Sequence, residues 1–480
     1  MPVRRNVYSL TPNGPRITSL RQGIAMMKSR PASDPTSWIY QANIHGTFDA
    51  PPNQQVARTW NQCQHGSFFF FSWHRMYLYF FERILQAASD NPNLALPYWN
   101  YFNPAQRALP VAFRQPADAS NPLFETRRAQ GINAGAQLPA APVSHTQAFT
   151  FINFSSPPGS GLSFGGPRVS QPVHLSPTFG ALENAPHNNV HGLVGGSSGF
   201  MNSVNLAARD PIFWLHHSNI DRLWKRWLDQ GGGRRNPVGN DVWMDSEFTF
   251  FDENGQEVTI SGSEILDTVN QLDYRYDDDP ANLPLVPFAA AVAAAEAGSS
   301  GEERERTLLG ESEGAEVMEL GAEPLTVPVE VRGEAADAAA EAATAEVVEN
   351  RVVLSLEGIQ YDENPGVSYE VYINLPEGQE PDPQSEYFVG TLGFFGLEPH
   401  GHGAEDHEQP SGKVDYDITA NVRALAARGE WGKGQISVTF VMSGLLPTAE
   451  TDAEAEAATV TVQKEPGGRP RIERVTVTTE

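Results

Sequence analysis

The chain contains a single cysteine, Cys63, among its 480 residues. One thiol cannot form an internal disulfide, so the fold does not depend on an oxidising compartment. No stretch approaches the roughly 18 uncharged apolar residues that a membrane-spanning helix requires, so we expect no membrane partner. The N-terminal segment MPVRRNVYSLTPNG lacks the apolar core of a secretory signal. The sequence therefore predicts a cytoplasmic protein.

Basic residues are scarce and unevenly placed: 33 Lys and Arg stand against 59 Asp and Glu, for a net charge of −26. Residues 1–230 hold 18 of the basic and 10 of the acidic residues, a net +8, which leaves −34 for the remainder. The positive half lacks the dense Lys/Arg clusters that nucleic-acid binding requires, so we expect no nucleic-acid partner. Two parts of opposite charge could dock on each other, although a solvated acidic tail would give the same balance.

Three regions differ in composition. Residues 1–285 are rich in aromatic residues and proline, with helical periodicity followed from residue 231 by an extension of turns and short strands. Residues 286–350 are biased toward Ala, Glu and Gly and nearly lack aromatics, so we interpret them as an acidic linker. In residues 351–480 apolar and polar residues alternate, as at Val352, Leu354 and Leu356. This period of two predicts an antiparallel β-sandwich.

The positions of the 12 histidines are more informative than their number. His65 and His74 flank four phenylalanines in HGSFFFFSWH, and PHNNVHG places His187 and His191 on one face if that segment is helical. A zinc protease would carry glutamate after the first histidine of such a pair, but Asn188 stands there. The spacing alone is weak evidence for a metal, because histidines four residues apart are common.

Two adjacent histidines, His216 and His217, lie in ARDPIFWLHHSNIDRLW, where Asp210 and Pro211 predict the start of a helix. Adjacent helical residues point about 100° apart, so the two have different surroundings. A set of histidines without a cysteine cluster suits copper, iron or zinc, and copper has the highest affinity at nitrogen sites. Two groups of three would hold two metal ions, each with an open position.

These stretches resemble the two copper-binding signatures of the tyrosinase and polyphenol oxidase family. HGSFFFFSWHRMYLYFFERIL resembles the first signature and RDPIFWLHHSNIDRLW the second, while LPYWNYFNP resembles the segment between them. DVWMDSEFTFFDENGQ and RVVLSLEGI with SYEVYINL are similar to the two C-terminal modules of plant-type members. The resemblance implies a mainly α-helical catalytic domain with a four-helix bundle around a dicopper site, followed by the C-terminal antiparallel β-sandwich.

The resemblance also implies the ligands of two copper ions. Those of the first copper are His45, His65 and His74. Those of the second copper are His187, His191 and His217. His217 is chosen over His216 because it stands seven residues after Asp210, the family's spacing, and His216 is then expected to face elsewhere as a hydrogen-bonded core residue. Asp221 and Arg222 are expected to orient the same helix.

Four further residues have roles implied by the family. Cys63, two residues before His65, matches the arrangement of fungal-type members in which the thiol forms a thioether with the ligand histidine, although a small buried hydrophobe is the alternative. Glu183 and Asn188 resemble the pair proposed to hold a water that deprotonates a monophenol, unless Glu183 only caps or pairs locally. Val204 aligns with the gate above the first copper.

The implied activity is that of a tyrosinase-type polyphenol oxidase, which hydroxylates small monophenols to o-diphenols and oxidises these to o-quinones with dioxygen as co-substrate. Two alternatives remain open. One is a catechol or o-aminophenol oxidase that lacks the hydroxylation step. The other is an oxygen carrier, because haemocyanin units share the six-histidine pattern and also carry a β domain over the site.

The family further implies that the C-terminal domain docks on the catalytic domain as a lid and makes the chain latent until the linker is cut, for instance at Arg304 or Arg306. Apolar side chains that could occupy the substrate position are those of Phe394, Phe395 and Leu397. The nearby histidines of a polar loop, for which we expect a surface position rather than copper binding, are His400, His402 and His407. Two other loop histidines with no partner evident from the sequence are His145 and His174.

Overall fold

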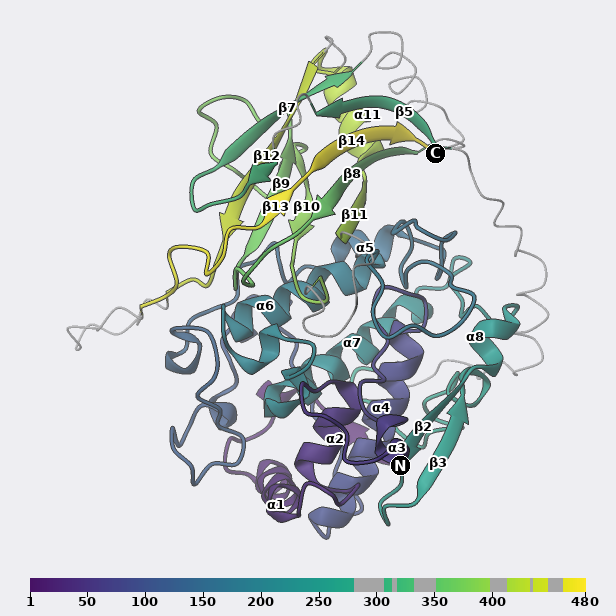
Figure 1. The fold of residues 1–480 in the computed structure, drawn as a ribbon. Coiled ribbons are helices and arrows are strands. Elements are labelled where there is room, and N and C mark those ends of the chain that lie inside the picture. The colour runs from purple at the N-terminus through teal and green to yellow at the C-terminus, as the bar shows by residue number, and fades with distance from the viewer. Residues whose placement is uncertain (280–305, 313–316, 332–350, 398–411, 432–434, 448–460) are drawn as a thin grey trace.

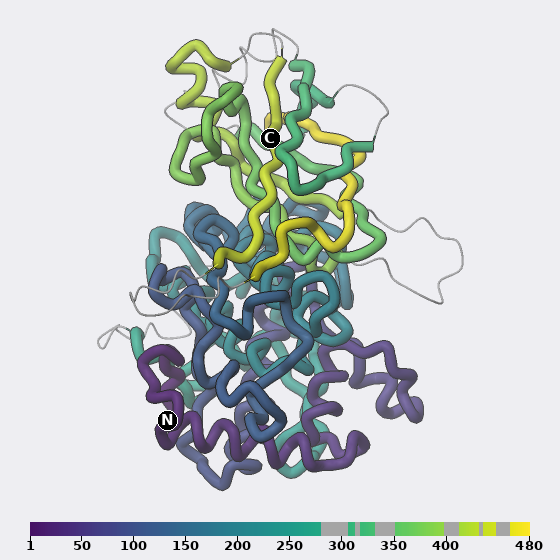
Figure 2. Tube along the Cα trace, turned by 90° about the vertical axis from the view of Figure 1, so that its left-hand side faces the viewer, coloured from purple at the N-terminus to yellow at the C-terminus, as the bar shows by residue number. Residues whose placement is uncertain are grey.

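The computed structural model describes residues 1–279, 306–312, 317–331, 351–397, 412–431, 435–447 and 461–480. Residues 1–279 form a part dominated by helices, which we call the helical part. The described residues from 306 to 480 form a part dominated by strands, which we call the sheet part. The sheet part lies on one side of the helical part in both views (Figures 1 and 2). No helix among the described residues is long and apolar enough to span a membrane.

Two long helices, each of 19 residues, form the centre of the helical part. The helices are α1 (Pro15–Ser29), α2 (Trp38–His45), α3 (Gln54–Ala57), α4 (Phe70–Ala88), α5 (Thr146–Thr150), α6 (Asn189–Gly195), α7 (Pro211–Asp229) and α8 (Asp241–Asp245). The long ones are α4 and α7. The start of α7 is as predicted, because the Asp210 side chain accepts a hydrogen bond from the Ile212 N–H and proline occupies the first helical position.

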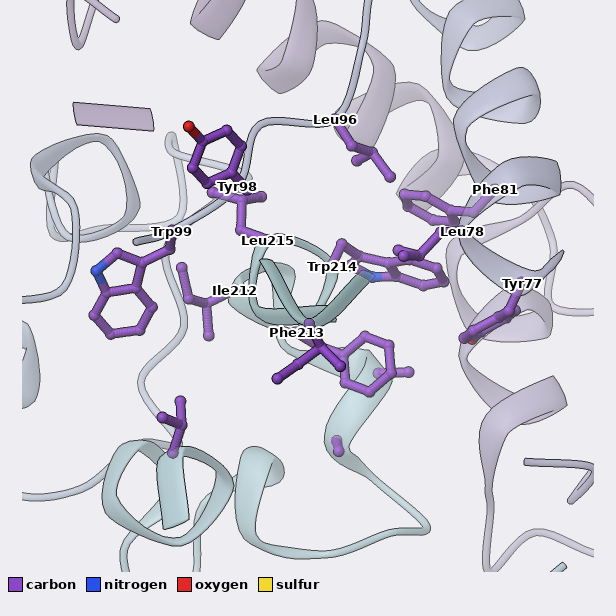
Figure 3. Close-up of a cluster of buried hydrophobic side chains, with 14 of the residues drawn as sticks. Tyr77, Leu78, Phe81, Leu96, Tyr98, Trp99, Ile212, Phe213, Trp214 and Leu215 are labelled. Atoms are coloured by element: carbon purple, nitrogen blue, oxygen red, sulfur yellow. The ribbon is translucent and has the colours of Figure 1, made fainter. Parts of the chain in front are cut away.

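Aromatic packing holds α4 against α7 (Figure 3). Phe81 of α4 stacks on Trp214 of α7 with ring centroids 3.3 Å apart, and Tyr77 lies against the same indole at 4.7 Å. All three side chains are buried. Such aromatic pairs contribute about 0.5–1.5 kcal/mol beyond their area burial. The packing fixes the neighbouring turns of both helices, on which His74 and His217 lie.

A buried charge cluster also fixes α7. Asp221 accepts hydrogen bonds from Arg75 of α4 at 2.6 Å, from Arg4 at 3.3 Å, and from the hydroxyls of Tyr274 and Tyr276, both at 2.6 Å. Burial alone would raise the pKa of Asp221, but Arg75 and Arg4 lower it below its ordinary value. The carboxylate therefore stays ionised. It links α7 to α4 and to the first and last segments of the helical part in sequence, which carry Arg4 and the two tyrosines.

Short strands flank the helices. β1 (Val3–Arg4) pairs in parallel with β4 (Arg275–Tyr276), and β2 (Glu247–Phe251) pairs with β3 (Glu257–Ser261) as an antiparallel hairpin. Strand β4 carries Tyr276 of the charge cluster, so the extension predicted after residue 231 packs back onto the N-terminus.

The sheet part is built on one eight-stranded antiparallel sheet with the order β10-β9-β12-β7-β5-β14-β8-β11. Its strands are β5 (Thr307–Ser312), β7 (Leu325–Val331), β8 (Val352–Ile359), β9 (Ser368–Ile373), β10 (Phe388–Leu392), β11 (Gly412–Asp417), β12 (Gln435–Ser443) and β14 (Arg474–Thr479). A further pair joins β6 (Met318–Glu319) to β13 (Arg471–Ile472), and helix α11 (Thr419–Ala427) follows β11.

The sheet curls so that its two ends meet. Tyr416 of β11 donates a hydrogen bond from its hydroxyl to the carbonyl oxygen of Thr391 in β10, at 3.1 Å. The alternating side chains of β8, β9 and β12 fill the interior of this curled sheet. Where we expected a sandwich of two sheets, the hydrogen bonds form one continuous sheet, because β7 and β5 join the strands on either side of them.

The structure corrects the predicted linker over residues 286–350. Strands β5 and β7 lie inside this range and occupy the middle of the sheet, between β12 and β14. The alternation in LTVPVEV, residues 325–331, was hidden in the average composition of a region rich in Ala and Glu. Residues 286–305 and 332–350 lie outside the described residues.

Candidate metal centre

The six predicted histidine ligands converge in the interior of the helical part. His45 ends α2, His74 lies on α4, His191 on α6 and His217 on α7, while His65 precedes α4 and His187 lies in a π-helical turn over Glu183–Asn188. All six are buried. The rings of His45 and His65 have centroids 5.3 Å apart, and His74 stacks on His217 at 4.4 Å. Four helices and two adjoining segments therefore surround one space.

Backbone carbonyls orient three of these rings. The Nδ1 atoms of His45, His74 and His191 hydrogen-bond to the carbonyl oxygens of Val204, Phe70 and Met201, at 2.9, 2.7 and 2.7 Å. A carbonyl oxygen can only accept, so each Nδ1 carries the hydrogen and each Nε2 presents a lone pair. Metal-binding histidines are oriented in the same way, by a hydrogen bond from the ring nitrogen that does not bind the metal.

Several Nε2 atoms face the shared space and are available to bind metal ions. No hydrogen-bond partner among the described residues reaches Nε2 of His45, His65, His74 or His187. Leaving a buried polar atom unsatisfied costs about 1–3 kcal/mol, which indicates that this space is built to hold a ligand. The candidate ligand atoms form three overlapping groups, each within 4.8 Å, and these groups do not coincide with the two predicted triads. They are His187, His191, His216 and His217; His45, His74 and His217; and His45, Cys63 and His65. Imidazole donors of this kind fit copper.

Burial keeps these histidines neutral. It lowers the pKa of His45 and of His187 to about 3. Burial and the neighbouring imidazoles hold the pKa of the other rings well below the ordinary value, namely those of His65, His74, His191, His216 and His217. A neutral imidazole is the form that binds metal, so protons do not compete with a metal ion at neutral pH.

The structure corrects the expected position of His216. Its Nδ1 lies 3.1 Å from the Tyr101 hydroxyl, as expected for a hydrogen-bonded core residue. Its ring nevertheless stacks on His187 at 5.3 Å, and its Nε2 has no partner among the described residues. His217 faces His74 instead, and its Nε2 lies 3.2 Å from that of His191. His216 and His217 therefore both contact the group of site histidines, although they are adjacent on α7.

Of the four consecutive phenylalanines, Phe70 is the one in ring contact with the site. Its ring lies 4.7 Å from that of His74 and 4.6 Å from that of His187. Phe71 instead packs on Phe164 and Trp224 in the surrounding core, as expected for most of this run. From α7, Phe213 covers His217 with centroids 4.1 Å apart. Apolar rings therefore line the space between the imidazoles and keep water from it.

Glu183 contacts the residue after the predicted ligand His65, and Asn188 contacts the predicted ligand His187. The Glu183 carboxylate is fully buried, and its oxygens accept from the Gly66 N–H at 2.9 and 3.1 Å, directly after His65. Burial raises the pKa of this carboxyl well above its ordinary value. Asn188 accepts from Nδ1 of His187 at 2.8 Å, and its Nδ2 has no partner among the described residues.

Two other predicted positions also lie at the site. Val204 is buried, and its carbonyl orients His45, which places this residue beside the first predicted ligand set. The Cys63 sulfur lies 3.3 Å from Nδ1 of His65 and is fully buried. It also lies 3.4 Å from Nδ1 of His174, a contact between residues 111 positions apart that the sequence did not indicate.

Phe395 of the sheet part enters the metal centre. Its ring stacks on His191 with centroids 3.7 Å apart and an interplanar angle of 11°. It also meets the rings of His65 and His187 edge to face, at 5.7 and 5.5 Å. The preceding Phe394 instead packs inside the sheet part. Of the three apolar side chains considered, Phe395 therefore occupies the space in front of the imidazoles; His400, His402 and His407 lie outside the described residues.

Hydrogen bonds between neutral groups hold the sheet part against α6. Asn189, between His187 and His191, donates from Nδ2 to the Thr391 hydroxyl at 2.8 Å and accepts from the Ser368 hydroxyl at 2.7 Å. The ends of β10 and β11 lie close to α5 and α6 (Figure 1). No ion pair between two described residues joins the helical part to the sheet part. The opposite net charges of the two regions therefore do not produce a direct ion pair among the described residues.

Arg306 is a poor position for the linker cut that we expected there. It pairs with Asp415 and Glu480 of the sheet part, both at 2.9 Å, and donates to the Ser160 hydroxyl of the helical part at 3.0 Å. These contacts hold the start of β5 in place, whereas a protease needs an extended, accessible chain. Arg304 lies outside the described residues.

Three family models match the chain in succession. The common central domain of tyrosinase matches residues 35–230, and the polyphenol oxidase middle domain matches residues 238–284. A domain of unknown function, DUF7868, matches residues 306–463, which begin with the strands inside the predicted linker. All six predicted histidine ligands lie within the first match.

Relatives and solved structures agree with these matches. The chain is 32% identical to a tyrosinase of Hahella sp. (strain CCB-MM4), over 95% of this chain and 97% of that one. It is 34% identical to the latent polyphenol oxidase of Prunus armeniaca over 56% of this chain, and spans about half (47%) of that relative. The structure of latent apple tyrosinase has a TM-score of 0.64 at 20% identity, covering 100% of this chain and 97% of that one. That of latent aurone synthase has a TM-score of 0.66 at 20% identity, covering 100% and 89%.

The structural likeness extends over the helical part and the sheet part together, which agrees with a helical catalytic domain and a β-rich C-terminal region. The near full-length match to a tyrosinase covers the histidine motifs as well as the C-terminal region. The cluster of buried imidazoles is consistent with the copper chemistry of these relatives. The chain therefore belongs to the tyrosinase and polyphenol oxidase family of copper-dependent oxidoreductases.

Proposed function

We propose that the chain is a latent tyrosinase-type polyphenol oxidase that hydroxylates monophenols to o-diphenols and oxidises these to o-quinones with dioxygen. The observation that carries this proposal is the convergence of six buried imidazoles, several with Nδ1 engaged and Nε2 directed into one space. The first copper ion is assigned to His45, His65 and His74. The second is assigned to His187, His191 and His217.

The protein fixes the positions of the imidazoles and excludes water from between them. When bound, the two copper ions supply the capacity to bind and reduce dioxygen. Helices α2, α4, α6 and α7 act as the four-helix bundle that fixes the imidazoles, and the charge cluster at Asp221 holds α7 in register. Phe70 and Phe213 exclude water from between the rings, so a phenol meets a preorganised site.

For hydroxylation we assign proton removal from the monophenol to Glu183, assisted by Asn188. A phenol has a pKa of about 10 and binds as phenolate only if a nearby group takes its proton. The Glu183 carboxylate is buried next to Gly66, the residue after His65, and Asn188 has an amide N–H without a partner among the described residues. Val204 is assigned to the entrance above the first copper, where a small side chain admits the ring.

These assignments are tested by comparing two substrate classes on copper-loaded protein that lacks the sheet part. Glu183→Gln and Val204→Phe should each lower tyrosine hydroxylation at least tenfold, which is about 1.4 kcal/mol in the barrier, while changing catechol oxidation less than threefold. Glu264→Gln, at an exposed helix cap, is the matched control. Equal losses on both substrates would assign Glu183 and Val204 to structure alone.

Two alternative functions make different predictions with the same protein. A catechol or o-aminophenol oxidase would produce colour with a catechol and none with tyrosine. A haemocyanin-like carrier would bind dioxygen reversibly and turn over neither substrate. The family's curated relatives named here are a tyrosinase and a polyphenol oxidase, which supports the enzyme. Oxygen uptake with tyrosine and then with a catechol distinguishes all three.

Latency is assigned to the sheet part. Phe395 fills the space in front of His191, where the aromatic ring of a substrate would have to lie. The two solved structures named above are both of latent enzymes, which supports this assignment for the present chain. We also assign Cys63 to a thioether with His65, supported by the short distance between the sulfur and the ring.

A further inference from the structure

His174 contacts Cys63 from a loop 111 positions away in the sequence. Its Nδ1 is 2.8 Å from the Cys63 carbonyl oxygen and 3.4 Å from the Cys63 sulfur. The carbonyl can only accept, so the hydrogen is on Nδ1 and this N–H points at both the oxygen and the sulfur of Cys63. His65 contacts the same sulfur through its own Nδ1 at 3.3 Å. The sulfur is therefore held between two imidazole rings.

The backbone fixes His174 to this position independently of its side chain. The His65 N–H donates to the His174 carbonyl at 3.1 Å, and the Ser176 N–H donates to the His65 carbonyl at 3.1 Å. Gly66 has a φ of +70°, and a Cβ there would lie 2.1 Å from the Ser176 carbonyl oxygen. The two segments thus run in contact, so His174 faces Cys63 without rearrangement of the chain.

We propose that His174 is a positioning residue that holds the Cys63 sulfur against the His65 ring for formation of the thioether bond. This inference rests on the proposed function, because dioxygen must be available as the oxidant. The step joins Sγ of Cys63 to Cε1 of His65, the ring carbon next to Nδ1. The S–H and C–H bonds are broken, two protons leave, and two electrons reduce one dioxygen to hydrogen peroxide.

The physical effect of His174 is to select one orientation of the thiol. A cysteine side chain has three staggered χ1 positions, and only one of them places Sγ at the ring. The bifurcated N–H of His174 favours that position and prevents the sulfur from turning toward the backbone of its own loop. Removing the ring also opens space beside the thiol, so the productive orientation should fall to about one third or less of the population.

The test follows crosslinking after copper is added in air to the copper-free full chain. Intact mass reports the loss of two hydrogens, about 2 Da. Alkylation after unfolding reports Cys63 that is still free. His174→Ala should form the bond at least threefold more slowly than the unmodified protein at equal copper content. His174→Asn, whose amide N–H can replace Nδ1–H, should restore much of the rate. His145→Ala, at another half-buried loop histidine that packs on Phe102, should have no effect.

The results separate this inference from the proposed function. Crosslinking of His174→Ala at the unmodified rate would overturn the role of His174 while leaving the thioether intact. An unmodified protein that oxidises a catechol yet yields fully alkylatable Cys63 would overturn the thioether, and the role of His174 with it, but not the activity. A deficit in His174→Ala that His174→Asn does not relieve would show that the ring's bulk matters rather than its N–H, and would overturn positioning through this hydrogen bond.

Discussion

The ring of Phe395 lies flat on the imidazole of His191, with centroids 3.7 Å apart, although the two residues belong to different parts of the molecule. Both side chains are fully buried. The contact therefore contributes to docking of the sheet part, and it also covers His191. A substrate ring can reach His191 only after Phe395 leaves.

Phe395→Ala should activate the full chain. Truncating a buried phenylalanine costs about 3–5 kcal/mol, and here part of that loss falls on docking and the obstruction itself is removed. Catechol oxidation should rise at least tenfold at equal copper content, measured by oxygen uptake. Phe388→Ala is the matched control, because Phe388 packs on Tyr372 within the sheet part and contacts no site histidine. Unchanged latency of Phe395→Ala would show that this ring does not block the site.

Thr391→Val should raise the basal activity of the full chain by a smaller factor. The substitution removes one of the two acceptors of the Asn189 amide, the Thr391 hydroxyl 2.8 Å away, while keeping the shape of the side chain; the Pro142 carbonyl at 3.3 Å remains. Leaving the N–H that faces Thr391 unsatisfied costs about 1–3 kcal/mol, so the undocked population should rise roughly tenfold. Thr439→Val is a suitable control, since Thr439 bonds to Thr326 inside the sheet, away from the interface. Equal catechol oxidation by the two variants would show that the hydrogen bond between Asn189 and Thr391 does not hold the sheet part in place.

The sequence predicted which histidines converge better than it predicted what covers them. The six histidines are recognisable from the family resemblance of the segments around them, and helix geometry predicts that His187 and His191 share one side. Phe394 and Phe395 are adjacent and equally apolar, so composition could not tell which one faces the site. That choice depends on how the curled sheet docks, which is a long-range property.

Other contacts were missed for the same reason. His174 meets Cys63 across 111 positions, and Asn189 meets Thr391 across 202. The one local signal was Asn189 itself, a polar residue placed between two predicted ligands. Strand β7 was assigned to a linker because its alternation covers few residues in an acidic region. Period-two patterns need a local window, whereas composition averages over a longer one.

Substituting the two adjacent histidines separately should reveal which one binds copper. His217→Ala should lower the copper content below two ions per chain and abolish catechol oxidation, while leaving the protein folded. His216→Ala should keep both ions, because the family's spacing from Asp210 assigns the ligand to His217, although Nε2 of His216 also faces the site without a partner among the described residues. Metal analysis by mass spectrometry, with circular dichroism as a check of folding, gives the answer. Copper loss from His216→Ala with retention in His217→Ala would reverse the assignment.

Asp221→Asn should destabilise the helical part. The carboxylate neutralises Arg75 and Arg4 in the interior, and removing its charge leaves both guanidinium groups less compensated. Breaking a buried pair of this kind costs about 3–5 kcal/mol. Asp278→Asn is the control, because Asp278 pairs with Arg222 nearer the surface, where the effect should stay below about 1 kcal/mol. Urea unfolding followed by tryptophan fluorescence measures both, and equal midpoints would refute the anchoring role of Asp221.

The last prediction concerns acid. Asp415 of β11 accepts from the Gly161 N–H of the helical part at 3.2 Å, and the cationic groups facing it are Arg306 and Lys413. Burial alone would raise the pKa of Asp415, but the hydrogen bond and charge of Arg306, together with Lys413, lower it below its ordinary value of about 4.

Arg306 and Lys413 belong to the sheet part and stay beside Asp415 when the sheet part undocks, so of these partners only the Gly161 N–H is gained on docking. A hydrogen bond to the ionised carboxylate favours docking above the undocked pKa, and this contribution is lost as the pH falls through the docked pKa. Between pH 5 and 8, Asp415 should therefore keep the chain latent, and activation through it should require a pH below about 4. The measurement exposes the full chain briefly to pH 3–7 and then assays catechol oxidation at pH 7, with fluorescence to exclude unfolding. Asp415→Asn should be partly active without acid, whereas Asp362→Asn, at an exposed pair with Arg471, should stay latent. Activation of the unmodified chain already at pH 5 would place the acid-sensitive group elsewhere in the interface.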